Sequence, residues 1–127
     1  MKRTDIINNL IKNYKFTSYL EIGVRRKENF NQIKCNKKIC VDPLYPSDFK
    51  MKSSKFFTKN KDNFDIIFID GSHLEKDVDV DITESLKILN KGGLIVMHDC
   101  NPPTEQHQLE SPVLGQWNGT VWNHLLN

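Results

Sequence analysis

Two apolar runs in this chain end abruptly in acidic and imidazole side chains. The first ends at Asp70, with His73 three residues further on, and the second ends at His98 and Asp99. A continuous apolar run is typical of a parallel strand that is buried on both faces, and ligands bind at the carboxyl ends of such strands. We therefore expect two neighbouring strands to deliver carboxylates and imidazoles to one site.

A second group of candidate residues follows two earlier strands. Glu21 and Gly23 close the first of them, and Asp42 closes the next, 21 residues after Glu21. In nucleotide-binding sheets, a glycine in the first turn lets the backbone approach the ligand, and an acid about 20 residues onward accepts hydrogen bonds from the ribose hydroxyls. Gly23 is followed by Val24 and Arg25 rather than by further glycines, so the pattern that binds a pyrophosphate is absent. These two strand ends favour a nucleoside ligand that lacks a pyrophosphate.

The elements that must position these residues alternate between strands and helices along the chain. Such alternation predicts right-handed crossovers and a mostly parallel sheet, with ligands lying across the carboxyl ends of its strands. The expected strands cover residues 19–23, 38–42, 55–58, 65–70 and 94–97, and the expected helices cover residues 6–14, 30–33, 78–89 and 121–126.

Length, charge and cysteine content limit the classes of protein to consider. The chain has 127 residues, which suits a single domain, and its formal net charge of +2 gives no field that would attract nucleic acid or an anionic membrane. No apolar run approaches the ~20 residues that cross a bilayer. Three cysteines at spacings that fit neither a zinc site nor a redox pair indicate a reducing compartment, so we expect a cytoplasmic protein. The acidic side chains between residues 75 and 84 are expected to face solvent.

Five segments of the sequence, taken in order, resemble the successive motifs of class I S-adenosylmethionine-dependent methyltransferases. The closest subgroup is the bacterial small-molecule type, whose strand ends read D-G-x-H and H-D. The segments are YLEIGV at 19–24, VDP at 41–43, FDIIFIDGSH at 64–73, GGLIVMHDCNP at 92–102 and WNGTVW at 117–122. The resemblance implies an α/β, Rossmann-like fold with a mostly parallel sheet in strand order 3-2-1-4-5, formed by one domain over residues 1–127.

The resemblance also implies a cofactor and a role for each strand-end residue. The cofactor would be S-adenosylmethionine: Glu21 would hold its methionine amino group, Gly23 would let it lie against the backbone, and Asp42 would bind its ribose hydroxyls. Asp70 would complete the cofactor site and take part in catalysis. The activity implied is methyl transfer to an oxygen or nitrogen of a small molecule, such as a sugar or a secondary metabolite.

Two routes would remove the proton that the acceptor loses during methyl transfer. In the first, His73 acts as a general base beside Asp70, because imidazole has a pKa near neutrality. In the second, Asp70 and Asp99 share a magnesium ion, since neighbouring strand ends lie ~4.8 Å apart and two carboxylates that close need a cation or a proton between them. Catechol-type methyltransferases resemble this arrangement but add an asparagine, whereas here Cys100 follows Asp99 and Asn101 comes one place later.

The sheet of this family normally closes with a C-terminal β-hairpin, which this sequence is expected to lack, so that the domain would be incomplete at its C-terminus. The strand over 94–97 would then form an apolar edge, which favours a homodimer through edge pairing.

Two other functions stay open at this point. One is a non-catalytic module that keeps the methyltransferase fold. The other is a metal-dependent hydrolase that uses Asp70, His73, His98 and Asp99, because histidines and carboxylates suit several divalent metals.

Overall fold

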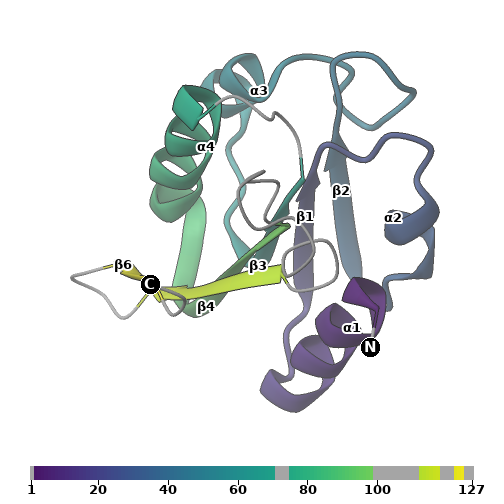
Figure 1. The fold of residues 1–127 in the computed structure, drawn as a ribbon, viewed down its shortest axis with the longest axis vertical. Helices are drawn as coiled ribbons and strands as arrows, with labels where there is room; N and C mark the ends of the chain where they lie inside the picture. The colour runs from purple at the N-terminus through teal and green to yellow at the C-terminus, as the bar shows by residue number, and fades with distance from the viewer. Residues whose placement is uncertain (1, 71–74, 99–111, 118–121, 125–127) are drawn as a thin grey trace.

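One β-sheet with helices on both faces makes up the described part of the chain (Figure 1). The computed structural model describes residues 2–70, 75–98, 112–117 and 122–124. Within these ranges, no helix combines the length and the apolar character that crossing a membrane requires. The helices are α1 (Arg3–Tyr14), α2 (Glu28–Gln32), α3 (Ser53–Lys59) and α4 (Glu75–Ile88), and the strands are β1 (Ser18–Ile22), β2 (Lys37–Val41), β3 (Phe64–Ile69), β4 (Leu89–His98), β5 (Pro112–Trp117) and β6 (Trp122–His124).

The strand order confirms the predicted Rossmann-like class. The sheet runs β2-β1-β3-β4-β5-β6. The first four strands in this order are parallel to one another, whereas β5 and β6 are each antiparallel to the strand before them. Parallel strands linked by helices form the crossovers that the alternating sequence pattern predicted.

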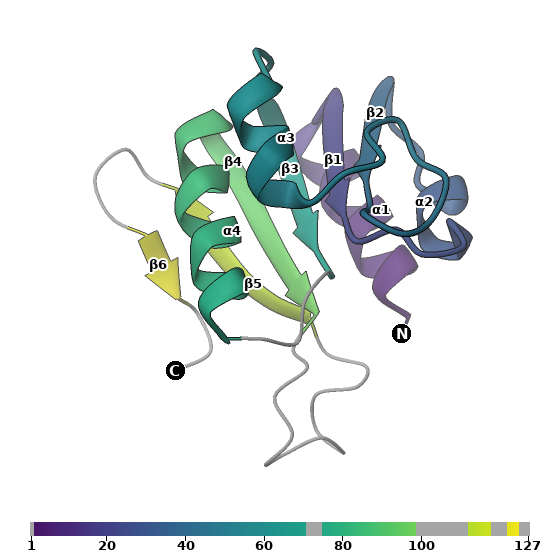
Figure 2. The ribbon, with the colours of Figure 1, turned by 90° about the horizontal axis from the view of Figure 1, so that it is seen from above.

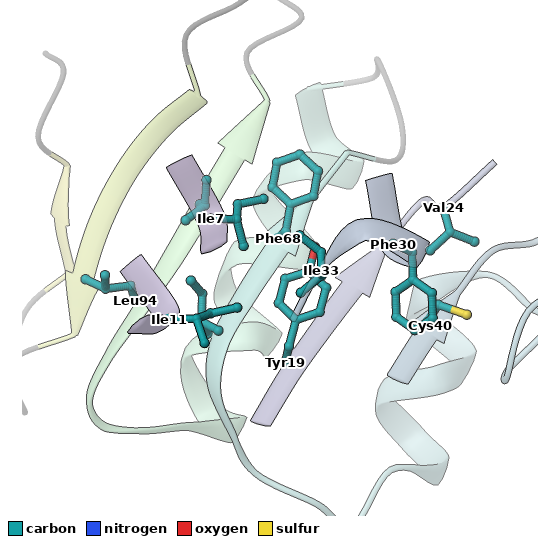
Figure 3. Close-up of a cluster of buried hydrophobic side chains, with 11 residues drawn as sticks. Ile7, Ile11, Tyr19, Val24, Phe30, Ile33, Cys40, Phe68 and Leu94 are labelled. Carbon is teal, nitrogen blue, oxygen red and sulfur yellow. The ribbon is translucent and has the colours of Figure 1, made fainter. Parts of the chain in front are cut away.

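The first face of the sheet is covered by α1 and α2. Tyr19 of β1 and Phe68 of β3 lie in one apolar cluster with Ile7 and Ile11 of α1 and Phe30 of α2 (Figure 3). Ile7 and Ile11 are four residues apart, so they share one side of α1, and both are buried. The predicted opening helix is therefore confirmed, and its packing holds the first turn of α1 against the sheet.

The second face is covered by α3 and α4. Leu20 and Ile67 project to this face because side chains alternate along a strand. They share a cluster with Phe56 of α3, and Ile82 and Leu86 of α4 pack against it. The two clusters give the domain three layers, with the sheet in the middle.

The strand predicted over residues 55–58 is wrong, because that segment lies within α3. Phe56 is fully buried, and its ring meets the ring of Phe49 edge-on with a centroid separation of 5.0 Å. The position beside β2 is held instead by a single parallel bridge between Val41 and Phe49. The expected third strand is thus reduced to one residue pair. The aromatic residues that suggested a strand belong to α3 instead.

The bare sheet edge predicted at 94–97 is also wrong. β5 pairs with β4 from Leu94 to His98, and β6 pairs with β5. The final helix predicted over 121–126 is contradicted at β6, which is a strand. An antiparallel pair therefore stands where no C-terminal hairpin was expected. Because β4 is paired with a strand on each side, it offers no free edge to a second copy of the chain. The homodimer through that edge therefore stays a prediction.

Candidate functional site

The register of the parallel strands brings three predicted site residues to one edge of the sheet. Ile22 at the end of β1 is aligned with Val41 at the end of β2. The Gly23 N–H donates to the Val41 carbonyl at 2.7 Å, and the Asp70 N–H donates to the Ile22 carbonyl at 2.8 Å. Gly23, Asp42 and Asp70 therefore follow directly on three neighbouring strands.

A cavity of about 640 Å³ opens at this edge. Its volume lies in the range of roughly 300–1,000 Å³ that is usual for small-molecule sites. Gly23, Asp42 and Asp70 all line it, so three of the four residues predicted to bind the cofactor share one cavity. The wall continues over the loop after β2 and the facing parts of α3 and α4, where it includes Tyr45, Lys52, Ser53 and Asp81.

Asp42 presents an ionised carboxylate to the cavity and also ties two loops together. Its Oδ1 accepts the backbone N–H groups of Leu44 and Tyr45 at 2.8 and 2.9 Å, and its Oδ2 accepts the N–H of Arg25 at 2.9 Å. Burial would raise the pKa of Asp42, but the backbone N–H groups of Tyr45, Arg25, Leu44 and Val24 hold the pKa below its ordinary value. Asp42 therefore both holds the loops after β1 and β2 together and lines the cavity.

The loop after β1 folds back through a backbone region that favours glycine. Gly23 has a φ of 87°, which glycine adopts without steric cost. Arg25 and Lys27 also have positive φ values, 50° and 64°. For a residue with a Cβ this costs on the order of 1 kcal/mol, and the Arg25 N–H bond to Asp42 offsets part of that cost.

Asp70 lies at the cavity wall beside a basic side chain from the other side of the sheet. Its side chain is 7% exposed, and its Oδ2 lies 3.6 Å from Nη1 of Arg3 in α1. The two opposite charges thus lie close together, with the carboxylate in a position that is almost closed to water. The first turn of α1 thus contacts Asp70 from the face opposite α3 and α4.

Glu21 does not line the cavity, although the sequence predicted that it would hold the methionine amino group. Its buried Oε1 accepts hydrogen bonds from the Tyr19 hydroxyl and, at 2.8 Å, from the side-chain amide of Asn29. The pKa of Glu21 is raised to about 7, chiefly by burial; the hydrogen bonds from Tyr19 and Asn29 and the charge of Arg3 oppose this rise, and the nearby Asp70 carboxylate adds to it. Glu21 therefore supports the site from behind the strand ends, in the layer of α1 and α2.

Sequence reasoning missed Asp81, which is 2% exposed and lines the cavity. The expectation that the acidic stretch faces solvent is wrong for this residue. The Ser53 hydroxyl donates a hydrogen bond to Asp81 Oδ1, which joins α3 to α4. One signal could have indicated this burial: Asp81 and Ser85 are four residues apart and lie immediately before the inward apolar positions Ile82 and Leu86.

The mouth of the cavity is apolar. Among the described residues, four large apolar side chains are exposed, and three of them line this cavity: Leu44 at 77%, Tyr45 at 37% and Val80 at 44% exposure. Exposed apolar groups that gather at one place mark a binding surface. The cavity therefore combines buried carboxylates with an apolar rim.

The remaining predicted residues cannot be placed. His73, Asp99, Cys100 and Asn101 lie outside the described residues, as does the side chain of His98. In the described part of the chain, no three histidine, cysteine or acidic side chains gather in a way that would hold a metal ion. The general base and the magnesium site therefore stay predictions. Of the residues expected to form them, the structure describes only Asp70.

A family model described as a methyltransferase domain matches residues 20–100, from within β1 past the end of β4, a range that holds the strand ends at the cavity. The chain belongs to this methyltransferase domain family. No curated protein sequence matches the chain.

Solved structures of methyltransferases share the fold at low sequence identity. An O-methyltransferase from Bacillus cereus, in complex with S-adenosylhomocysteine, has a TM-score of 0.59 at 12% identity, over 75% of this chain and 55% of that one. MycE, from the mycinamycin biosynthetic pathway and in complex with Mg, S-adenosylhomocysteine and mycinamycin VI, has a TM-score of 0.59 at 16% identity, over 84% of this chain and 39% of that one. The N-methyltransferase NodS from Bradyrhizobium japonicum has a TM-score of 0.57 at 16% identity, over 86% and 74% of the two chains. This methyltransferase domain therefore spans about half the length of the first of these enzymes.

Proposed function

We propose that this domain binds S-adenosylmethionine in the cavity at the carboxyl edge of the sheet and transfers its methyl group to an oxygen or nitrogen of a small molecule. One observation carries the proposal: Gly23, Asp42 and Asp70, predicted from three separate motifs, line a single cavity in a chain of the methyltransferase domain family. Solved structures with the same fold contain S-adenosylhomocysteine, which supports the choice of cofactor.

The residues of the cavity suit the parts of this cofactor. The positive φ of Gly23 turns the chain at the end of β1, so the ligand can lie against the backbone there. The Asp42 carboxylate, held ionised by backbone N–H groups, is a strong acceptor for ribose hydroxyls. Leu44 and Tyr45, two and three residues after Asp42, offer apolar surface to a purine ring. A nucleoside ligand that lacks a pyrophosphate can therefore make all of these contacts.

Positioning is the main contribution of the protein to such a reaction. S-adenosylmethionine supplies a methyl group on a positively charged sulfur, and the acceptor must lose a proton. In our proposal Asp70 lies beside the reacting groups and His73 takes that proton. A magnesium ion held by Asp70 and Asp99 is the alternative route, and MycE was solved with Mg. We also propose a cytoplasmic location, in keeping with the free thiols of Cys35 and Cys40.

Calorimetric titration with S-adenosylhomocysteine tests the cofactor site. We expect saturable binding to the wild-type domain and an affinity reduced about tenfold or more in Asp42→Asn, because a charge-assisted hydrogen bond to the ribose is lost. Asp62→Asn is the matched control, since Asp62 is exposed and pairs with Lys37 away from the cavity. Equal affinity in Asp42→Asn and wild type would remove the ribose contact, and binding without methyl transfer to any acceptor would favour the non-catalytic module.

A further inference from the structure

We infer that the methyl acceptor is a small molecule that carries phosphate groups, and that lysines on and beside α3 bind these groups at the rim of the cavity. The lysine stretch, as we call it, comprises Lys50, Lys52, Lys55, Lys59 and Lys61. This inference rests on the proposed function and names the chemical class of its second substrate. S-adenosylmethionine carries no phosphate, so the two ligands can be tested separately.

Positive charge in the lysine stretch is not balanced by the fold. No acidic residue lies between residues 50 and 61, and all five lysines are exposed. Within the described part of the chain none of them forms an ion pair, whereas Lys37, outside the stretch, pairs with Asp62 at 3.1 Å. Lys55 and Lys59 are four residues apart on one side of α3, and like charges at this spacing destabilise a helix. Helix stability therefore does not explain these lysines.

The lysine stretch reaches the cavity at the first turn of α3. Lys52, Ser53 and Ser54 all line the cavity, and from Lys52 to Lys59 the chain rises about 10 Å along the helix axis. Figure 2 shows α3 on the outside of the sheet, beside α4. The Ser53 hydroxyl donates to Asp81, whereas the Ser54 hydroxyl has no hydrogen-bond partner among the described residues. Ser54 can therefore donate to a phosphate oxygen next to Lys52.

Charges in the cavity are separated by depth. Its three carboxylates, those of Asp42, Asp70 and Asp81, are buried. Its two cationic residues, Arg25 and Lys52, are exposed. The buried carboxylates suit the positively charged sulfur of S-adenosylmethionine, whereas an exposed lysine at the rim suits an anion, and lysine binds phosphate as a point charge. The cavity is thus complementary to a cationic cofactor below and an anionic acceptor above.

Two larger sources of phosphate fit this surface less well. A helix that docks on a membrane offers apolar side chains to the lipid. None of the large apolar side chains that are exposed in the described residues belongs to α3, and Phe56 is fully buried. A nucleic acid binds along an extended basic surface, but α4, which packs beside α3, carries the exposed Asp79. A small phosphorylated molecule, held at the start of α3, is the occupant that these observations favour.

Calorimetric titration with inorganic pyrophosphate tests the phosphate site, both on the protein alone and on the protein saturated with S-adenosylhomocysteine. Low salt is used, because salt screens exposed charges. The variants are Lys52→Ala, Lys52→Arg and the double variant Lys52→Ala/Lys55→Ala. Lys12→Ala is the matched control, since Lys12 is an exposed lysine of α1 that does not line the cavity. A single-stranded thymidine oligonucleotide is titrated for comparison.

We expect saturable binding of pyrophosphate to wild type that persists when S-adenosylhomocysteine saturates the cofactor site. Lys52→Ala should weaken pyrophosphate binding about fivefold or more, and the double variant about tenfold or more, because charge-assisted contacts are lost. Lys52→Arg should keep most of the affinity, since arginine also binds phosphate. Lys12→Ala should stay within about twofold of wild type, because it removes the same charge from a surface away from the cavity.

Four results would overturn the inference. If S-adenosylhomocysteine binds and pyrophosphate does not, the inference fails and the proposed function stands. Competition between the two ligands would mean that the phosphate site overlaps the cofactor, and equal losses in Lys52→Ala and Lys12→Ala would reduce the effect to net charge. Tighter binding of the oligonucleotide than of pyrophosphate would assign the lysine stretch to a polynucleotide. Pyrophosphate binding without any binding of S-adenosylhomocysteine would instead refute the proposed function, and with it the assignment of this phosphate site to a methyl acceptor.

Discussion

The side-chain amide of Asn29 donates a hydrogen bond to Oε1 of Glu21 at 2.8 Å and so joins α2 to the buried centre of the sheet. The same carboxyl oxygen accepts the Tyr19 hydroxyl. A buried carboxyl with two hydrogen-bond donors and an acidic neighbour, Asp70, has an unusual titration, and this leads to the first prediction.

Glu21→Gln should make the protein more stable than wild type at neutral pH but not at acid pH. The pKa of Glu21 is about 7 in the folded protein, against 4.5 ordinarily, so the folded state binds more protons than the unfolded state between these values. Wild-type stability therefore falls as pH rises through that interval, by on the order of 3 kcal/mol. Glutamine keeps an acceptor oxygen for Tyr19 and Asn29 and does not titrate. Urea unfolding at pH 4.5, 6 and 7.5 measures the difference, and a gap that does not grow with pH would contradict the burial of Glu21.

Asp65→Asn should show the opposite pH dependence. Burial opposes ionisation of Asp65, but the Thr17 N–H at 2.8 Å and the Asn90 amide at 2.9 Å lower its pKa below the ordinary value. Its contribution is therefore present above about pH 4 and is lost as pH falls further. We expect a loss of about 1–2 kcal/mol at pH 7 that shrinks as the pH falls through the lowered pKa of Asp65. Thermal unfolding across this range tests it, and an equal loss at pH 7 and pH 3 would speak against the ionised form as the hydrogen-bonded one.

Gly93→Ala should destabilise the protein more than Gly92→Ala. A Cβ on Gly93 would lie 2.5 Å from the Asp65 carbonyl oxygen and 2.8 Å from that of Asn90, so backbone would have to move. At Gly92, with a φ of 83°, no atom lies within 4 Å of the added Cβ, and only the cost of a positive φ, about 1–2 kcal/mol, is expected. Urea unfolding of the two variants gives the comparison. The reverse order would show that β4 is packed differently around these two glycines.

Ser53 and Asp81 should behave as a coupled pair. The Ser53 hydroxyl donates to the buried Asp81 carboxylate across α3 and α4, and both residues line the cavity. Unfolding of Ser53→Ala, Asp81→Asn and the double variant should give a coupling free energy of about 1–2 kcal/mol. The double variant should also bind S-adenosylhomocysteine more weakly than wild type. Additive stability losses would argue that the two helices are not joined by this bond.

The parallel strands of the sheet could be predicted because their local sequence pattern, a continuous apolar run, agrees with their buried position in the folded protein. The apolar runs before Asp70 and before His98 are buried strands, and β1 and β2, which precede them in the sheet order, lead into Gly23 and Asp42 at the same edge. Periodicity and strand-end residues are both local signals. They were sufficient to bring Gly23, Asp42 and Asp70 into one cavity.

The errors arose where contacts distant in sequence decide the structure. Phe56 has high strand propensity, but packing of its ring on Phe49 and in the layer of α3 and α4 favours a helix. Asp81 belongs to an acidic stretch, and its hydrogen-bond partner Ser53 lies on another helix, 28 residues away in the sequence. The predicted contact of Glu21 with the ligand stays a prediction, and its Oε1 accepts hydrogen bonds from Tyr19 and Asn29 inside the layer of α1 and α2. None of these partners can be identified from the local sequence.

The most direct test of the account is a titration of ¹⁵N-labelled protein with S-adenosylhomocysteine, followed through the backbone amide resonances. We predict saturable shifts at Gly23, Leu44 and Asp70, which lie around the cavity, and no shifts at Asn60 and Lys12. Absence of shifts at millimolar ligand, or shifts confined to residues away from the carboxyl edge of the sheet, would contradict a cofactor site at this edge.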